Sequence, residues 1–333
     1  MLPTLGDLLD TARVVALPLR TRFRGIMVRE ALILEGPNGF TEFSPFTEYP
    51  DDEAVAWLAA AIDFGWAQPH PLLRDTVGVN ATMPAVAPSE VAAILARYPG
   101  CRTVKVKVAD PGHTLADDVA RVREVRELLG PEGRIRVDAN GLWSLDEAER
   151  AVHALAGFDL EYVEQPCASV DELAQLRERI GYLDVPIAAD ESVRKASDPL
   201  AVARAGAADL LVIKAQPLGG IAAALRIVSE AGLPVVVSSA LDTSVGISMG
   251  LHLAGAIPEL EYDCGLATAA LLAADVTDYP LVAEAGAIAV RRVELSAGRM
   301  REVAASADRT DWWINRLERT YALWRGIQEQ RDI

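Results

Sequence analysis

The chain has 333 residues, of which 51% are hydrophobic, and its formal net charge is −16. The apolar content excludes a disordered chain, and the acidity argues against nucleic acid or an anionic membrane surface as a partner. The three cysteines are too widely spread for a disulfide framework or a zinc site. With no basic-then-apolar leader and no uncharged run that would comfortably span a bilayer, we expect a cytoplasmic protein.

The first part of the chain shows no regular alternation of strands and helices. Apolar runs and a helix-opening cluster of acids predict strands at 14–19, 26–34 and 40–43, and a helix at 51–62. A basic loop, residues 20–25, is expected between the first two strands and carries Arg22 and Arg24. We therefore predict a small α+β domain over residues 1–77, with residues 285–333 packing back on it.

From about residue 78 the pattern changes to apolar strands that alternate with amphipathic helices. The expected strands are 78–81, 103–108, 135–138, 162–165, 187–190, 210–214, 235–239 and 261–265. The expected helices are 89–97, 115–129, 145–155, 170–180, 199–205, 221–231 and 244–256. Such alternation is typical of a parallel sheet covered by helices. Eight strands about 25 residues apart favour a closed (β/α)8 barrel, a TIM-like catalytic domain, over residues 78–284. A GxGxxG sequence follows none of the strands, which argues against a dinucleotide site.

Charged residues end five successive strands, in the order Lys, Asp, Glu, Asp, Lys. One such residue alone is usually a helix cap or a solvated side chain, but buried charges cost several kcal/mol unless they are paired or bind a metal. Active sites of barrels form at these strand ends, so the joint pattern indicates function. Both lysines of the first strand alternate with valines and share one face. The residues are Lys105 and Lys107, Asp138 with Asn140 beside it, Glu164, Asp190 and Lys214.

Three carboxylates without a nearby histidine or cysteine suit a hard cation that prefers oxygen ligands. Mg²⁺ fits best, with Mn²⁺ as the alternative. A lysine beside a divalent cation and another ammonium group has a lowered pKa and can act as a general base. The metal would stabilise the negative charge that develops when a proton next to a carboxylate is removed.

This arrangement resembles the enolase superfamily, in its muconate-lactonising branch. The resemblance extends over nearly the whole chain and implies a barrel with an α+β capping domain. It also implies a Lys-x-Lys pair, three metal ligands and an opposite lysine. The matching residues are Lys105 and Lys107 for the pair, Asp138, Glu164 and Asp190 for the metal, and Lys214 for the opposite lysine.

Three further segments, residues 23–30, 42–46 and 237–246, are similar to the o-succinylbenzoate synthases of menaquinone biosynthesis, especially the actinobacterial kind. That similarity implies a lyase that dehydrates a small dicarboxylate, 2-succinyl-6-hydroxy-2,4-cyclohexadiene-1-carboxylate. Lys107 would remove the proton α to the ring carboxylate and later protonate the leaving hydroxyl. Lys214 would steady the intermediate across the ring by its charge and by cation–π contact.

The remaining candidates are substrate-binding residues. Arg22 and Arg24 could close over the site and meet the succinyl carboxylate, although a solvated loop would look the same in the sequence. Ser239 could bind a substrate oxygen or cap the next helix. Lys105 and Asn140 complete the expected substrate-binding set.

The residues also leave rival activities open. The first is an N-acylamino acid racemase or dipeptide epimerase of the same superfamily, which would use both lysines as bases. Dipeptide epimerases typically carry Asp-x-Asp on strand eight, where residues 263–265 supply only the first acid. The chain could also catalyse muconate cycloisomerisation, or form a non-catalytic barrel that binds a small anion. Such a binding barrel would predict a broken member of the charged set, and none is broken.

Overall fold

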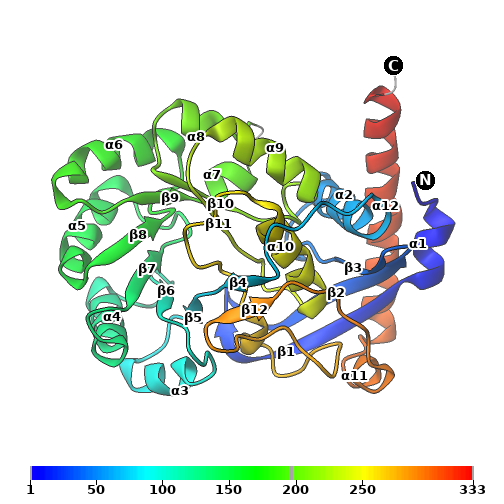
Figure 1. Cartoon of the computed structure of the whole chain (residues 1–333), viewed down its shortest axis with the longest axis horizontal. Helices are drawn as coiled ribbons and strands as arrows, with labels where there is room; N and C mark the ends of the chain where they lie inside the picture. The colour runs from blue at the N-terminus through cyan, green and yellow to red at the C-terminus, as the bar shows by residue number, and fades with distance from the viewer. Residues whose placement is uncertain (1, 196–197, 332–333) are drawn as a thin grey trace.

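The computed structural model describes residues 2–195 and 198–331. A barrel of strands ringed by helices lies beside a smaller unit, which carries both ends of the chain (Figure 1). The smaller unit is a three-stranded antiparallel sheet with helices packed against it. The predicted fold class, a (β/α)8-type barrel with an α+β capping domain, is confirmed.

The capping domain is built around a strand hairpin that is longer than the sequence predicts. Its elements are α1 (Leu5–Thr11), β1 (Arg13–Phe23), β2 (Ile26–Gly36), β3 (Gly39–Phe43) and α2 (Asp51–Trp66). The basic segment predicted as a loop is mostly strand, because β1 continues to Phe23 and pairs there with Ile26. The turn itself is Arg24–Gly25, with left-handed φ angles of 49° and 79°.

The barrel contains one parallel sheet of seven strands, in the order in which they follow along the chain. They are β5 (Ala81–Met83), β6 (Thr103–Lys107), β7 (Arg134–Asp138), β8 (Leu160–Glu164), β9 (Ile187–Ala189), β10 (Leu210–Ile213) and β11 (Val235–Val237). The predicted strand at 261–265 is reduced to two bridging residues. Cys264 pairs with Val79 and Gly265 with Ser238, and these two bridges close the barrel.

The first predicted barrel strand, 78–81, is misplaced. The chain makes two short strands there instead, and β5 begins only at Ala81. The earlier strand, β4 (Thr76–Gly78), pairs antiparallel with β12 (Ala287–Ala289).

The helices largely follow the sequence pattern. Five have the predicted bounds: α4 (Leu115–Leu129), α5 (Leu145–Leu155), α6 (Val170–Ile180), α9 (Ile221–Ala231) and α10 (Ser244–Ala256). Capping boxes explain where three of them begin, because Thr114, Ser144 and Ser169 each pair with an acid three residues later. The shorter elements are η1 (Pro88–Glu90), α3 (Val91–Leu95), η2 (Ala156–Phe158), η3 (Gly181–Leu183), α7 (Glu191–Arg194), α8 (Ala201–Arg204) and η4 (Thr268–Leu271).

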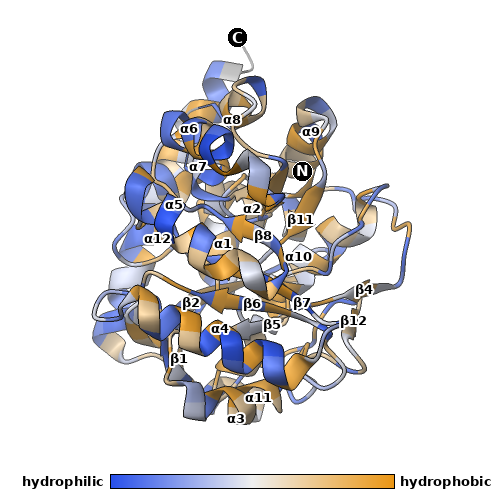
Figure 2. Ribbon diagram, turned by 90° about the vertical axis from the view of Figure 1, so that its left-hand side faces the viewer, coloured by the Kyte–Doolittle hydropathy of each residue, from blue (hydrophilic) through white to orange (hydrophobic). Residues whose placement is uncertain are grey.

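Alternation along the strands sorts side chains into two layers. In β6, Val104 and Val106 belong to the outer apolar cluster, which lies under the helices. The residues between them point inward, because successive side chains of a strand face opposite sides. An inner cluster contains Tyr162, Ala188 and Val212. Figure 2 shows the apolar barrel strands and the mixed polar and apolar surface of α4. The last inward position of each strand therefore lies at the mouth of the barrel.

The chain returns to the capping domain at its end. After α11 (Ala297–Glu302), the helix α12 (Ala307–Arg331) packs on α2 and β1 (Figure 1). Trp313 is fully buried there, 5.9 Å from the ring of Phe43, and its indole Nε1 donates a hydrogen bond to Glu30. These contacts join the end of the chain to the capping domain, and the domain division at residues 77 and 284 stays a prediction.

Among the described residues, no helix combines the length and the apolar character needed to cross a membrane.

The two neighbouring tryptophans of α12 allow a matched test of this packing. We expect Trp313→Ala to lower the free energy of unfolding by about 3–5 kcal/mol, because it empties a buried ring site. Trp312→Ala should cost clearly less, because Trp312 is only partly buried. Thermal and urea unfolding of the two variants would measure the difference, and equal losses would contradict the assigned packing.

Candidate active site

The charged strand ends predicted from the sequence meet at the mouth of the barrel. The strands are in parallel register, so that the Cα atoms of Lys107, Asp138 and Glu164 form one row across β6, β7 and β8. Each of these residues is the last inward side chain of its strand. Asp190 and Lys214 follow directly after β9 and β10 and extend the ring of charges.

Buried ion pairs connect these side chains. The Nζ atom of Lys105 lies 2.8 Å from Glu164 Oε1 and 3.3 Å from Asp138 Oδ2. Lys107 Nζ donates to Asp138 Oδ2 at 2.5 Å, and Lys214 Nζ donates to Asp190 Oδ2. Three lysines therefore neutralise three carboxylates in a part of the barrel from which water is largely excluded.

The environment shifts the pKa values of the two lysines of β6 in opposite directions. Burial tends to lower the pKa of Lys105, but Glu164 and Asp138 raise it above the usual lysine value, so this ammonium is held charged. For Lys107, burial and the charge of Lys105 lower the pKa, although Asp138 opposes the shift. Of these two side chains, Lys107 is the one more able to give up its proton and act as a base.

The pKa values of the three carboxylates are also shifted in different directions. Burial and the negative charge of Asp138 raise the pKa of Glu164 to about 7, although Lys105 opposes the shift. Burial also opposes ionisation of Asp138, but Lys107 and Lys105 lower its pKa. In the same way, Lys214 and Arg194 outweigh burial and lower the pKa of Asp190 to about 2.

Several neighbours fix the orientation of these groups. Asn140 Oδ1 accepts a hydrogen bond from Lys107 Nζ at 2.7 Å. Gln165 Oε1 accepts from the backbone N–H of Asp190 at 2.9 Å. Left-handed φ angles occur just past the ends of four strands, at Ala109, Asn140, Gln165 and Leu241. Backbone strain of this kind concentrates at functional sites.

One narrow cavity of about 40 Å³ lies above the charged ring. Most of the predicted substrate-binding residues line it, but Arg22 lies in a neighbouring cavity of about 160 Å³, together with His113. Phe23 and Arg24 belong to both cavities, since the β1–β2 turn lies between them. Predicted residues that line the first cavity are Arg24, Lys105, Lys107, Asp138, Asn140, Lys214 and Ser239.

Ser239 does not cap the following helix. The N-cap of α10 is Thr243, whose side chain accepts from Val245 N–H. Ser239 Oγ instead donates to the carbonyl of Gly265 and lies 2.8 Å from Thr268 Oγ1. The prediction that Ser239 could cap a helix is therefore wrong, and the residue lines the cavity.

The sequence did not reveal every residue near the cavity. Arg194 of α7 lines it and binds Asp190 Oδ1 through Nε at 3.1 Å. Tyr49, from the capping domain, accepts hydrogen bonds from Arg24 and Arg194. The spacing of four residues between Asp190 and Arg194, one turn of a helix, was a usable signal. Tyr49 had none, because its partners are distant along the chain.

The small number of lysines in the sequence supports a functional role for those at the barrel mouth. The chain has 32 lysine and arginine residues, and only four of them are lysines. Three of these four, Lys105, Lys107 and Lys214, stand at the barrel mouth. Lysine differs from arginine in that it can lose its proton inside a protein. The composition thus concentrates the deprotonable cations at one place.

The donor set suits a hard divalent cation. Asp138, Glu164 and Asp190 are almost completely buried and offer only oxygen atoms. Their charges are close enough that Asp138 and Asp190 both raise the pKa of Glu164. The carboxylates are paired with lysines, and within the described chain no three His, Cys, Asp or Glu side chains form a ready metal cage. A cation held by these three carboxylates would share their oxygen atoms with the lysines.

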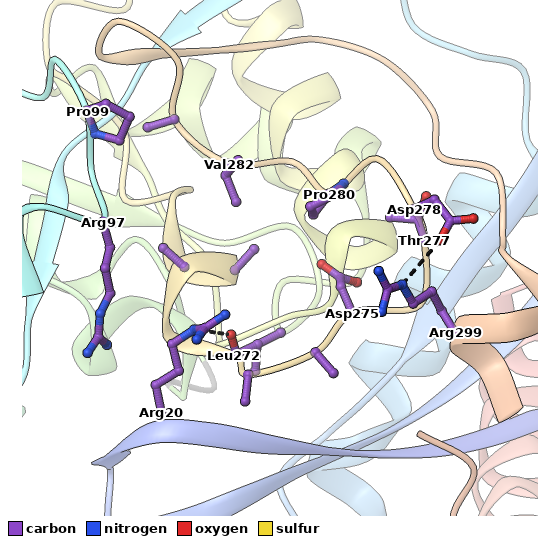
Figure 3. Close-up of a pocket in the computed structure, with 15 residues that line it drawn as sticks. Arg20, Arg97, Pro99, Leu272, Asp275, Thr277, Asp278, Pro280, Val282 and Arg299 are labelled. Carbon is purple, nitrogen blue, oxygen red and sulfur yellow. Dashed lines mark hydrogen bonds and ion pairs between the residues drawn. The ribbon is translucent and has the colours of Figure 1, made fainter. Parts of the chain in front are cut away.

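A larger hollow, of about 470 Å³, lies away from this chemistry (Figure 3). Its labelled lining includes Arg20, Arg97 and Arg299, together with Asp275. Arg20 donates to the carbonyl of Leu272, which joins β1 to the segment that follows η4. In the described chain, none of the strand-end lysines or carboxylates lines this hollow, so volume alone does not mark the site.

Known proteins support the same fold. A model of enolase N-terminal domain-like proteins matches residues 14–65, and one of enolase C-terminal domain-like proteins matches residues 89–294. An o-succinylbenzoate synthase of Mycobacterium ulcerans is 54% identical over 96% of both chains. One from Thermobifida fusca is 54% identical over 96% of this chain and 99% of its own.

Solved structures agree with this fold at lower identity. The muconate lactonizing enzyme of Pseudomonas putida superposes with a TM-score of 0.72 at 20% identity, covering 88% of this chain and 98% of the other. The N-succinyl Arg/Lys racemase of Bacillus cereus gives 0.73 at 20% identity, with 89% and 98% covered. At this identity the likeness concerns the fold alone.

The metal assignment can be tested by direct binding. We expect Glu164→Gln to weaken Mn²⁺ or Mg²⁺ affinity by at least about 10–100-fold, because loss of a mere hydrogen-bond partner of a ligand already costs that much and here one of three charged donors is lost. Calorimetry and Mn²⁺ electron paramagnetic resonance would measure this without an activity assay. Glu178→Gln, an exposed acid on α6, is the matched control. Unchanged affinity in Glu164→Gln would remove this residue from the ligand set.

Proposed function

Because the chain belongs to the o-succinylbenzoate synthases of the enolase superfamily, we propose that it is a lyase of menaquinone biosynthesis. The reaction is the syn dehydration of 2-succinyl-6-hydroxy-2,4-cyclohexadiene-1-carboxylate to 2-succinylbenzoate. The observation that carries this proposal is the intact set of charged strand ends, in a chain that aligns with relatives of this activity over nearly its whole length. The fold alone would not distinguish the substrate.

Lys107 acts first, as the base. Its Nζ takes the proton from the ring carbon next to the carboxylate, and the electron pair of that C–H bond moves toward the carboxylate. Burial and Lys105 support this role because they lower the pKa of Lys107. The hydrogen bond to Asn140 Oδ1 aims the amine from the β6 side of the cavity.

The second step returns the proton. The electron pair re-forms a ring double bond while the C–O bond to the hydroxyl breaks, and the Lys107 ammonium protonates the departing oxygen as water. One residue serves both steps because proton and hydroxyl leave from the same face. No external oxidant or reductant is needed, and the ring becomes aromatic.

The other charged groups hold the substrate and its developing charge. Lys214 lies beyond Asp190, directly after β10, and supports the ring by charge and cation–π contact. Lys105 is held as a permanent ammonium by Glu164 and Asp138. Arg24, at the β1–β2 turn, is suited to the succinyl carboxylate, with Arg22 in the adjoining cavity. Ser239 would donate to a substrate oxygen by turning its hydroxyl away from the carbonyl of Gly265.

A divalent cation, most suitably Mg²⁺, would be held by Asp138, Glu164 and Asp190 and would supply Lewis-acid stabilisation of negative charge on the substrate carboxylate. The chain's own contribution is to keep these three carboxylates buried and ionisable beside the base.

Lys107 offers a sharp test of the mechanism. We expect Lys107→Ala to lower kcat by about 10²–10⁴-fold with the fold intact, because the proton acceptor is lost. Lys107→Arg should be equally impaired, because a guanidinium keeps the charge but cannot deprotonate. Formation of the aromatic product with Mg²⁺ present would be measured, with circular dichroism as the check on folding.

The same assay separates the rival activities. Purified protein should be tested on the cyclohexadiene substrate, N-succinylamino acids and dipeptides in parallel. Dehydration by the wild type and near-normal turnover by Lys107→Arg would together refute the base assignment. Turnover of the amino acid derivatives alone would refute the substrate assignment and favour a racemase.

A further inference from the structure

The loop between β11 and α10, residues 238–243, forms one wall of the active-site cavity. Four of its residues, Ser238 to Leu241, line that cavity together with Lys105, Lys107 and Lys214. Its backbone is strained, because Leu241 has a φ of 62°, in the left-handed region that residues with a side chain rarely adopt. Such a conformation persists only where surrounding contacts impose it.

Two charged side chains of the capping domain bind this loop from outside the barrel. Arg29, on β2, is 2% exposed and donates through Nε to the carbonyl of Leu241 at 3.1 Å. Its Nη1 donates to Glu30 O, and its Nη2 donates to Ser44. The guanidinium is thereby fixed on the strained residue, and the rest of its donors are anchored in the capping domain.

Glu42, on β3, binds the other end of the loop. It is fully buried, and its Oε2 atom accepts from Thr243 N–H at 3.1 Å, Thr243 Oγ1 at 2.5 Å and Gly246 N–H at 3.1 Å. The partners lie more than 200 residues away along the chain, so a single carboxyl group joins two domains. Its second oxygen, Oε1, accepts from the hydroxyl of Ser44.

The first backbone N–H groups of α10 are all satisfied by protein side chains. Thr243 and Gly246 donate to Glu42, Ser244 donates to Asp275, and Val245 donates to the side chain of Thr243. These groups have no partner within a helix and otherwise attract water or an anionic ligand. Asp275 also belongs to the hollow of Figure 3. The helix end is thus closed to substrate, and its donors serve to hold the loop.

The fit around Glu42 is tight. A Cβ atom at Gly246 would lie 2.9 Å from Glu42 Cδ and 2.6 Å from Asp242 Cβ, so glycine is needed for this close approach. Burial and the charge of Asp242 raise the pKa of Glu42 to about 7. Both protonation states suit the position, because Oε2 accepts the three donors while Oε1 faces a hydroxyl that can donate or accept.

From this geometry we propose that Glu42 and Arg29 are positioning residues, through which the capping domain holds the 238–243 loop in its substrate-binding conformation. The capping domain then does more than cover the barrel. It imposes the shape of a cavity wall that the barrel alone would not keep. The role in substrate binding rests on the proposed function, whereas the role in ordering the loop does not.

Hydrogen exchange by mass spectrometry on the full-length protein tests the ordering. We expect Glu42→Ala to accelerate exchange of the amides in 239–246 by about tenfold or more, with barrel strands β7 and β8 unchanged. Glu42→Gln should stay within about threefold of wild type, because its amide oxygen still accepts the three donors. Glu35→Ala, which removes an exposed acid from β2, is the matched control and should change nothing.

Steady-state kinetics test the consequence for binding. Glu42→Ala should raise KM about tenfold or more while kcat changes less than about threefold, because the wall binds substrate and does not transfer protons. If Glu42→Ala does not fold, Glu42→Asp carries the same expectations, because it keeps the acid but shortens its reach toward α10. Unchanged exchange in 239–246, or acceleration spread evenly over the protein, would overturn the proposal. A local acceleration in a protein that lacks the proposed activity would support the ordering and refute only the proposed function.

Discussion

Charge balance at the barrel mouth is the constraint on which the rest of the site depends. Three lysines and three carboxylates are brought together with little access to water, and each buried charge would cost several kcal/mol without its partner. The parallel register makes the pairing possible, because Lys107, Asp138 and Glu164 are direct neighbours across three strands. Loss of one member would leave an opposite charge uncompensated, so the set is held together as a unit.

The same balance bears on how metal and substrate bind. The described cluster is neutral when its lysines and carboxylates are ionised, so a divalent cation adds two positive charges. A dicarboxylate substrate brings two negative charges and restores neutrality. A divalent cation and a dicarboxylate substrate would therefore favour each other electrostatically in this site.

Periodic features of the chain were readable from the sequence, and contacts between distant segments were not. Helices with capping boxes, such as α4 and α6, have the predicted bounds because local hydrogen bonds decide where they begin. The charged residues of the site could be predicted from the strand ends, because alternation along a strand determines which side chains face inward. The prediction of an eighth strand at 261–265 was wrong, since only Cys264 and Gly265 pair there. Tyr49 and Glu42 were missed because each also binds a barrel residue that lies far along the chain, Arg194 and Thr243 respectively.

The division of work between arginine and lysine connects these observations. Arg29 and Arg136 are almost completely buried, and each meets backbone carbonyls or an acid with several donors at once. A guanidinium suits such positions because its charge is permanent and its donors are fixed in a plane. A lysine at either place would offer one mobile ammonium that burial could neutralise. At the strand ends that same property is an advantage, because catalysis by proton transfer needs a cation that can give its proton up. The chain therefore uses arginine where charge must hold structure, and places at a strand end the one lysine, Lys107, whose charge must change.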